Sequence, residues 1–263
     1  MTVTALVENE CRCGLDTEHG LSLHIETDDG TRILFDMGQG PLFAKNAAIL
    51  GIDISAVDMA VISHGHYDHG GGLSEFLRLN SKAKVYVHRK AFDEHFSIRD
   101  TGITYIGLNR TLPERFPDRI CLCDDRTETA PGISLMAGTK GPYPRPAGNS
   151  LLLGPDRKTP DTFDHEQSLL VLEGSKKVLF AGCSHQGITN IIETAGDVTH
   201  VFAGFHLTKS SSNDLELLTE KLLAKKNCKY YTMHCTGIEN FVYLQKRMNE
   251  RISYFYCGSQ IKL

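Results

Sequence analysis

The sequence predicts an α+β protein in which residues 1–263 form one domain. Short apolar runs fill the first half, and residues 21–27 alternate apolar and polar side chains as a half-buried strand does. The second half repeats this pattern loosely and adds helical stretches, including 214–226 and 238–250. No stretch has the composition of a linker between two domains, so we expect a single compact unit.

Local signals place the elements along the chain. Residues 28–30, Asp-Asp-Gly, supply hairpin turn chemistry. Pro41 is tolerated in the first turn of a helix that Gly51 ends, and Asn213 is positioned to cap the helix 214–226. We expect strands at 2–9, 21–27, 32–35, 59–62, 84–88, 103–107, 120–123, 132–136, 168–172, 177–181, 199–203, 229–233 and 252–257, and helices at 41–50, 72–79, 90–96, 186–195, 214–226 and 238–250.

A cluster of metal-compatible side chains directly follows the apolar run 59–62. His64 and His66 are two residues apart in an extended segment, so they share a face and can bind one ion. The chain then turns, and Asp68 and His69 project toward a second position. Imidazole and carboxylate ligands suit zinc, iron or manganese. The competing interpretation, a histidine-rich surface loop, does not account for this spacing at the end of a buried strand.

This His-x-His-x-Asp-His motif resembles the signature of the metallo-β-lactamase superfamily, and the resemblance extends from end to end of the chain. The motifs at 182–188, 204–207 and 234–237 are similar to the branch that includes the archaeal dihydropterin–ribofuranosylaminobenzene phosphate synthases. The resemblance implies an αββα sandwich, in which two mixed β-sheets lie face to face with helices outside and metal ions at one edge.

The resemblance also implies two divalent metal ions, with zinc expected first and iron or manganese as alternatives. His185 follows a buried strand and is assigned as the third histidine of the first ion. The second ion is assigned to Asp68, His69 and His234, because His234 matches the last histidine of the superfamily. This second position has fewer protein donors than usual, so weak or absent binding there is an open alternative.

Three further residues are candidates near the metal ions. Cys183 stands where relatives carry a bridging aspartate, and it is either a thiolate ligand or a packed thiol. His165 lies just before the expected strand 168–172 and is a reserve ligand. Asp36 follows a strand, at the place where the superfamily uses an aspartate. That aspartate supports the metal loop, here residues 64–69, from beneath through hydrogen bonds. A turn or cap role for Asp36 is the competing interpretation.

The segment 138–162 is rich in Pro and Gly and is expected to be a lid over the metal site. Its Lys140 and Arg145 would bind an anionic group of the substrate, whereas a solvated linker is the alternative. His206 is expected to contact the substrate or to support the site. His88 is expected to be structural, and His95 is expected on the surface of a short helix.

Composition restricts the class of partner. The net charge of −4 gives no general attraction to nucleic acid or to an anionic membrane. No apolar run approaches the roughly 20 residues that span a bilayer, and no signal peptide is visible, so we expect a cytoplasmic protein. Its eight cysteines are then expected to be free thiols rather than disulfides. The expected partner is a small anionic substrate, and a homodimer is compatible with the sequence.

The leading hypothesis is metal-dependent hydrolysis, in which water activated by the ions attacks an ester- or phosphate-type bond and Asp68 accepts its proton. One alternative, from the branch resemblance alone, is a synthase that joins a dihydropterin pyrophosphate to a ribofuranosylaminobenzene phosphate. Another is a metal-binding protein without catalytic activity. Oxygen-reducing di-iron relatives carry Glu in place of His66, which argues against a redox function.

Overall fold

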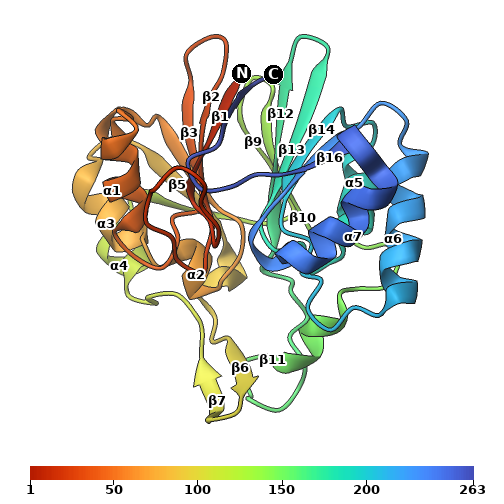
Figure 1. Ribbon diagram of the computed structural model, residues 1–263. Helices are drawn as coiled ribbons and strands as arrows, with labels where there is room; N and C mark the ends of the chain where they lie inside the picture. The colour runs from red at the N-terminus through yellow and green to blue at the C-terminus, as the bar shows by residue number, and fades with distance from the viewer.

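The computed structural model describes residues 1–263 and contains two seven-stranded sheets that face each other (Figure 1). The strands are β1 Thr2–Val7, β2 Ser22–Glu26, β3 Arg32–Phe35, β4 Met59–Ile62, β5 Lys84–His88, β6 Phe96–Arg99, β7 Gly102–Tyr105, β8 Ile120–Cys123, β9 Arg126–Ala130, β10 Ile133–Ala137, β11 Leu152–Leu153, β12 Gln167–Glu173, β13 Lys176–Ala181, β14 His200–Ala203, β15 Lys229–Thr232, β16 Ile252–Tyr254 and β17 Gln260–Lys262. The α-helices are α1 Leu42–Ile49, α2 Tyr67–Gly70, α3 Leu73–Leu79, α4 Leu112–Arg115, α5 Ile188–Ala195, α6 Ser212–Ala224 and α7 Ile238–Met248.

Both large sheets are mixed. The N-terminal sheet has the order β17-β1-β2-β3-β4-β5-β8, in which β3, β4, β5 and β8 run parallel. The C-terminal sheet has the order β16-β15-β14-β13-β12-β10-β9, in which β13 to β16 run parallel. Figure 1 shows α1, α3 and α4 outside one sheet and α5, α6 and α7 outside the other. The predicted αββα sandwich is therefore confirmed.

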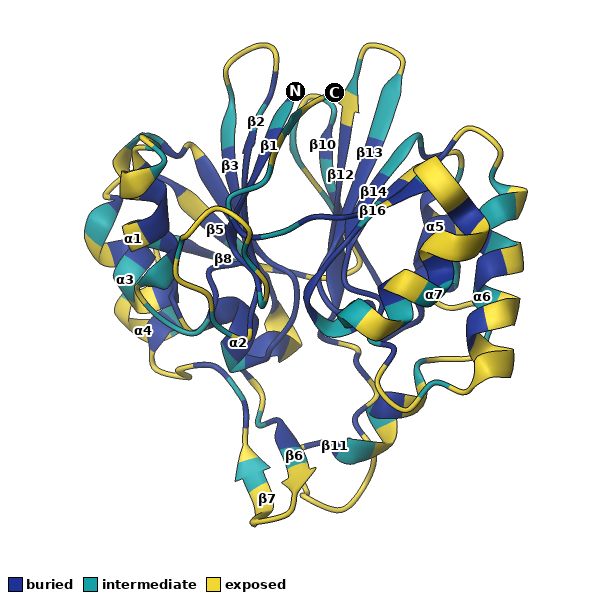
Figure 2. Ribbon diagram, viewed as in Figure 1, coloured by how far each residue is buried: buried dark blue, intermediate teal, exposed yellow.

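Strand periodicity explains why the sheets are buried on both faces. In β4, Ala60 and Ile62 belong to the hydrophobic cluster under the outer helices, whereas Met59 and Val61 belong to the cluster between the sheets. An apolar run without polar alternation is the pattern of such a strand. Figure 2 shows the strands largely buried and the outer faces of the helices exposed.

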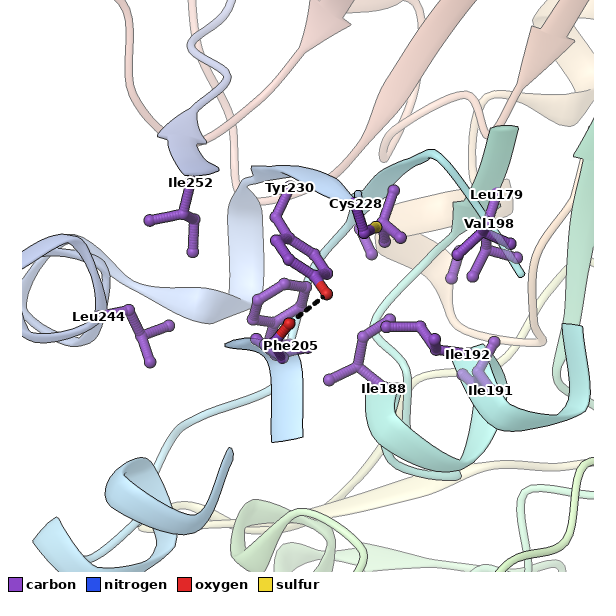
Figure 3. Packing of buried hydrophobic residues seen from close by; sticks show 14 of the residues in the cluster. Leu179, Ile188, Ile191, Ile192, Val198, Phe205, Cys228, Tyr230, Leu244 and Ile252 are labelled. Carbon is purple, nitrogen blue, oxygen red and sulfur yellow. Dashed lines mark hydrogen bonds between the residues drawn. The ribbon is translucent and has the colours of Figure 1, made fainter. Parts of the chain in front are cut away.

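Helices α5 to α7 pack on the C-terminal sheet through one cluster of 22 buried residues. Ile188, Ile191 and Ile192 of α5 face this cluster together with Tyr230 of β15 (Figure 3). The hydroxyl of Tyr230 donates to the carbonyl of Leu222 at 2.8 Å, so its polar atom is not left unpaired. Burying each such apolar side chain contributes about 1.5–3 kcal/mol to the free energy of unfolding.

The parallel strands bring their carboxyl ends to one edge of the sandwich, and four residues just beyond these ends have left-handed backbone conformations. These are Asp36 after β3, Ser184 after β13, His206 after β14 and His234 after β15, with φ angles of 59°, 59°, 46° and 50°. Non-glycine residues seldom adopt such angles. The conformation reverses the chain abruptly, so that side chains from adjacent strands face the same space.

A small sheet of order β11-β6-β7 projects from this edge, at the end of the molecule opposite to both chain termini (Figure 1). The segment 138–162, expected to be a lid, contains a 3₁₀ helix at Ala147–Leu151 and β11 of this sheet. One predicted element is wrong here. The helix expected at 90–96 is a 3₁₀ helix at Arg89–Phe92, and β6 begins at Phe96.

Two smaller differences complete the comparison with the predicted elements. Ser211, rather than Asn213, caps α6, because its side chain and that of Asp214 form a capping box. The chain does not end in the C-terminal sheet, since β17 crosses back and pairs with β1. No helix is both long and apolar enough to cross a membrane.

Candidate metal centre

The metal loop lies between β4 and α3, at the edge where the parallel strands end. His66 precedes the single turn of α2, which carries Asp68 and His69. All four metal-compatible side chains of this loop are buried. Gly72 follows, and a Cβ atom there would collide with the carbonyl oxygens of Met37 and Gly40, so the loop packs closely on the chain after β3.

The first group of donors contains His64, His66 and His185. The Nε2 atom of His64 lies 3.0 Å from Nδ1 of His66. The ring of His185 lies 5.0 Å from that of His64 and 5.1 Å from that of His66, centroid to centroid. The structure therefore brings together the three histidines that the sequence assigned to the first ion.

The second group contains Asp68, His69 and His234. The Oδ2 atom of Asp68 lies 3.4 Å from Nε2 of His234 and 3.9 Å from Nε2 of His69. His234 comes from the end of β15 in the opposite sheet, about 165 residues from the loop. These three side chains also converge as the sequence predicted.

Cys183 lies between the two groups. Its Sγ atom lies within 4.8 Å of donor atoms of His64 and His185, and also within 4.8 Å of donor atoms of His69 and His234. Sγ is 3.2 Å from Nε2 of His69. Burial raises the pKa of this thiol well above its usual value, so the metal-free protein holds a neutral thiol here. Its position allows contact with either ion.

Hydrogen bonds fix the orientation of the histidine rings. The Nδ1–H group of His69 donates to Asp36 Oδ2 at 2.6 Å, and that of His185 donates to Asn149 Oδ1 at 2.8 Å. His234 donates in the same way to Asn9 Oδ1 at 2.8 Å. In the neutral form of each ring the proton is therefore on Nδ1, and Nε2 has the lone pair.

Asp36 supports the loop as the sequence predicted. It accepts the backbone N–H of Ser63 at 2.7 Å and the hydroxyl of Ser63 at 2.7 Å, besides His69. The Ser63 oxygen then accepts from Nδ1 of His64 at 2.9 Å. One buried carboxylate thus orients one histidine directly and another through a hydroxyl group.

The electrostatics also suit a bound cation. Burial holds the pKa of His64, His66 and His185 well below 6.5, so these imidazoles are neutral, as ligands must be. Burial opposes the charged form of His69, but Asp36 and Asp68 outweigh it and raise the pKa of His69 to about 9. Burial likewise opposes ionisation of Asp68, but His69 and other neighbours hold its pKa well below the usual value.

The donors fit a divalent ion of the zinc type. Buried polar atoms nearly always have a hydrogen-bond partner, yet Nε2 of His66, His185 and His234 has none. These unpaired lone pairs, together with a carboxylate and a thiol, form a set of nitrogen, oxygen and sulfur donors that zinc accepts.

His165 has a supporting position. Its Nδ1 accepts the backbone N–H of Gly65 at 2.9 Å, and its Nε2 donates to Asp161 at 3.2 Å. Both ring nitrogens are therefore engaged, which leaves no lone pair for an ion. His95, expected on the surface, is only 3% exposed, because its Nδ1 pairs with the same Asp161 at 2.9 Å. This group holds the backbone of the metal loop.

A cavity of about 210 Å³ opens over the metal centre. His206 lines it, as expected, and both of its ring nitrogens are buried without a partner. Lys140 and Arg145 do not line it; both are exposed, and Arg145 donates to the carbonyl of Thr162. Arg99 of β6 lines the cavity instead.

Sequence reasoning missed several residues of this site. Asn9, Asn149 and Arg99 carry no spacing that marks them, because each acts on a partner far away in the chain. His19 also lines the cavity, with Nε2 at 3.3 Å from Asp68 Oδ2. The only feature of the local sequence that marks His19 is its position just before the strand β2.

The fold and the donor set define a class of αββα protein that carries a metal centre at the edge of two sheets. A family model described as the metallo-beta-lactamase superfamily matches residues 16–232. The chain belongs to this superfamily.

Two individual proteins and one solved structure are similar to nearly the whole chain. The 7,8-dihydropterin-6-methyl-4-(β-D-ribofuranosyl)-aminobenzene-5'-phosphate synthase of Methanocaldococcus jannaschii is 28% identical over 268 residues, which cover 94% of this chain and 90% of the synthase. An uncharacterized protein of the same organism is 27% identical and covers 92% of this chain and 96% of its own. The crystal structure of Tm1679, a metal-dependent hydrolase of the β-lactamase superfamily, is 29% identical, with a TM-score of 0.82, and the match covers 100% of this chain and 99% of Tm1679.

Proposed function

We propose that the protein is a metal-dependent hydrolase that acts on an ester- or phosphate-type bond of a small anionic molecule. The observation that carries this proposal is the convergence of two groups of donors in which Nε2 of His66, His185 and His234 is buried and unpaired. Divalent ions bound there would supply an activated water molecule and would polarise a carbonyl or phosphoryl oxygen.

The residues of this chain have separable roles in the proposed reaction. His64, His66 and His185 would hold one ion, and Asp68, His69 and His234 would hold the other, with Cys183 between them. Asp36, Asn9 and Asn149 keep the rings in the tautomer that leaves Nε2 free. His206, with two unpaired nitrogens at the cavity wall, would contact the substrate, and Asp68 would take up the proton of the attacking water.

Arg99 supports the proposal of an anionic substrate. Ser97 and Arg99 are two residues apart in β6, so they share a face, and both line the cavity. Among the lysine and arginine residues, Arg99 alone lines this cavity, and it has no carboxylate partner within 4.0 Å. A guanidinium group left free at a cavity wall suits a phosphate or carboxylate group of the substrate.

A second candidate is a synthase reaction, favoured by the relative that covers 94% of the chain. In this reaction the arylamine nitrogen of a ribofuranosylaminobenzene phosphate would form a bond to the methylene carbon of a dihydropterin pyrophosphate. The bond from that carbon to oxygen would break, pyrophosphate would leave, and the nitrogen would lose a proton. Arg99 would then bind one of the phosphate groups.

Turnover assays on the zinc-loaded protein separate these functions. The substrates are p-nitrophenyl acetate, a thioester, p-nitrophenyl phosphate, bis(p-nitrophenyl) phosphate and the pterin pyrophosphate with its arylamine acceptor. Hydrolysis of an ester or phosphate bond that is lost in His185→Ala supports the first proposal. Condensation without hydrolysis supports the second. A protein that binds two zinc ions and turns over none of these substrates contradicts both.

A further inference from the structure

His19 is held against the second group of donors by its own backbone. It lies just before β2, where the next two residues dock on the metal loop. The N–H of Leu21 donates to the carbonyl of Asp68 at 3.1 Å, and the side chain of Gln39 donates to the carbonyl of His19 at 2.7 Å. A Cβ atom on Gly20 would lie 2.6 Å from the Asp68 carbonyl oxygen, so only glycine allows this approach.

The carboxamide of Asn9 connects His19 to His234, and its orientation is determined by a backbone group. The N–H of Gly20 donates to Asn9 Oδ1 at 3.2 Å, so the oxygen must be on that side. The same oxygen accepts Nδ1–H of His234 at 2.8 Å. The amide nitrogen therefore faces His19, and it donates to Nδ1 of that ring at 3.2 Å.

This single amide gives the two rings opposite tautomers. His234 carries its proton on Nδ1 and presents a lone pair at Nε2. His19 accepts at Nδ1, so its proton is on Nε2, which points at Asp68 Oδ2 at 3.3 Å. A ring with a proton on Nε2 donates a hydrogen bond and does not bind a metal ion through that atom.

We propose that His19 is a hydrogen-bond donor to the substrate beside the second metal position, and that Asn9 keeps it in this role. The side chain of His19 is 59% exposed and lines the cavity, unlike the buried rings around it. The exposed ring is therefore free to turn from Asp68, which the bound ion would then occupy, to an oxygen of the bound molecule. This inference rests on the proposed function, because it needs a substrate oxygen at the second group of donors.

The alternative, that His19 is a further metal ligand, predicts a different result. His19, Asp68 and His234 have donor atoms within 4.8 Å of one another, which is compatible with a shared ion. Ligation by His19 would require loss of the Nε2 proton, and Nδ1 would then need to take up a proton while Asn9 donates to it. Two donors would face each other, which is unfavourable.

The test measures zinc content and the binding of inorganic phosphate to zinc-loaded protein, by elemental analysis and titration calorimetry. In His19→Ala we expect unchanged zinc content and phosphate affinity that is lower by about tenfold or more, as expected for a lost hydrogen bond to a charged group. His19→Gln keeps a side-chain N–H donor and should recover most of this affinity. His200→Ala, which removes a half-buried ring at the opposite end of β14, should change neither quantity.

The following results would overturn the proposal or the proposed function. Loss of zinc from folded His19→Ala would make His19 a ligand and overturn the proposal, as would phosphate affinity equal to that of the unchanged protein. Long-range ¹H–¹⁵N correlation spectra of the metal-free protein at alkaline pH should show the His19 proton on Nε2, and a proton on Nδ1 would also overturn it. Failure of the unchanged protein to bind zinc would instead refute the proposed function, while the spectra would still decide the tautomer.

Discussion

Replacing Asp36 with asparagine tests whether the orientation of the rings controls metal binding. Asp36 is fully buried and accepts three hydrogen bonds, two from Ser63 and one from His69 at 2.6 Å. Asparagine keeps the shape of the side chain and tolerates the left-handed backbone at this position, where φ is 59°. The variant therefore changes the chemistry of the hydrogen bonds with little effect on the backbone.

The expected loss follows from the number of acceptors. The asparagine side chain in Asp36→Asn would offer one acceptor oxygen. The backbone N–H of Ser63 can only donate, so it would hold that oxygen at the Oδ1 position, and the amide N–H group would face Nδ1–H of His69. His69 must then move its proton to Nε2, which removes the lone pair from the second ion. Removing support of this kind typically lowers metal affinity by about 10–100-fold, or about 1.4–2.7 kcal/mol. Losing a hydrogen bond to a charged group would also lower the free energy of unfolding of the metal-free protein by about 1.5–3 kcal/mol.

The assay is competition for zinc against a chromophoric chelator, combined with urea unfolding of the metal-free protein. The second ion should weaken more than the first, because Asp36 acts on His64 only through Ser63. Asp53→Asn is the matched control, since Asp53 is exposed and far from the site. Zinc affinity within twofold of that of the unchanged protein, in a folded Asp36→Asn variant, would refute this reasoning.

Three further outcomes are expected. His185→Ala should bind about one zinc ion fewer per chain. His165→Ala should keep its zinc, because both nitrogens of His165 are engaged by hydrogen bonds. Equal losses of zinc in the two variants, measured by elemental analysis, would contradict the ligand assignment. Arg99→Ala should raise the KM for an anionic substrate about tenfold with little change in kcat. Lys140→Ala should change neither constant, and steady-state kinetics of both variants measure the difference. Burial raises the pKa of Cys228 from 9.0 to about 11, so the neutral thiol stabilises the fold fully below pH 9. This contribution of about 3 kcal/mol is lost as the pH rises through 11. Urea unfolding across this range should show that loss, and Cys228→Ala should show a correspondingly smaller one.

The metal loop could be predicted because its information is local. His64 and His66 are placed by strand periodicity, and His185 and His234 are placed by their positions just after buried strands. Carboxyl ends of parallel strands meet at one edge, so these distant histidines had to converge once the strands were assigned. Family resemblance supplied the arrangement of two mixed sheets face to face with helices outside.

Apart from Asp36, the residues that orient the histidine rings could not be predicted, because their roles depend on partners that are remote in the chain. Asn9 orients His234 across 225 residues, and Asn149 orients His185 from within a segment interpreted as a lid. The buried position of His95 was missed for a related reason. The strand that follows it, β6, pairs with β11, and no local pattern in 90–96 reveals that partner.

The backbone at this edge shows how the fold and the site constrain each other. Left-handed conformations at Asp36, Ser184, His206 and His234 cost about 1–2 kcal/mol each and persist only where the surroundings determine them. All four lie in or beside the proposed centre, whereas the strands before them are regular and buried on both faces. The stability of the two-sheet core thus allows strained turns at one edge, and these turns direct donors from both sheets into one space.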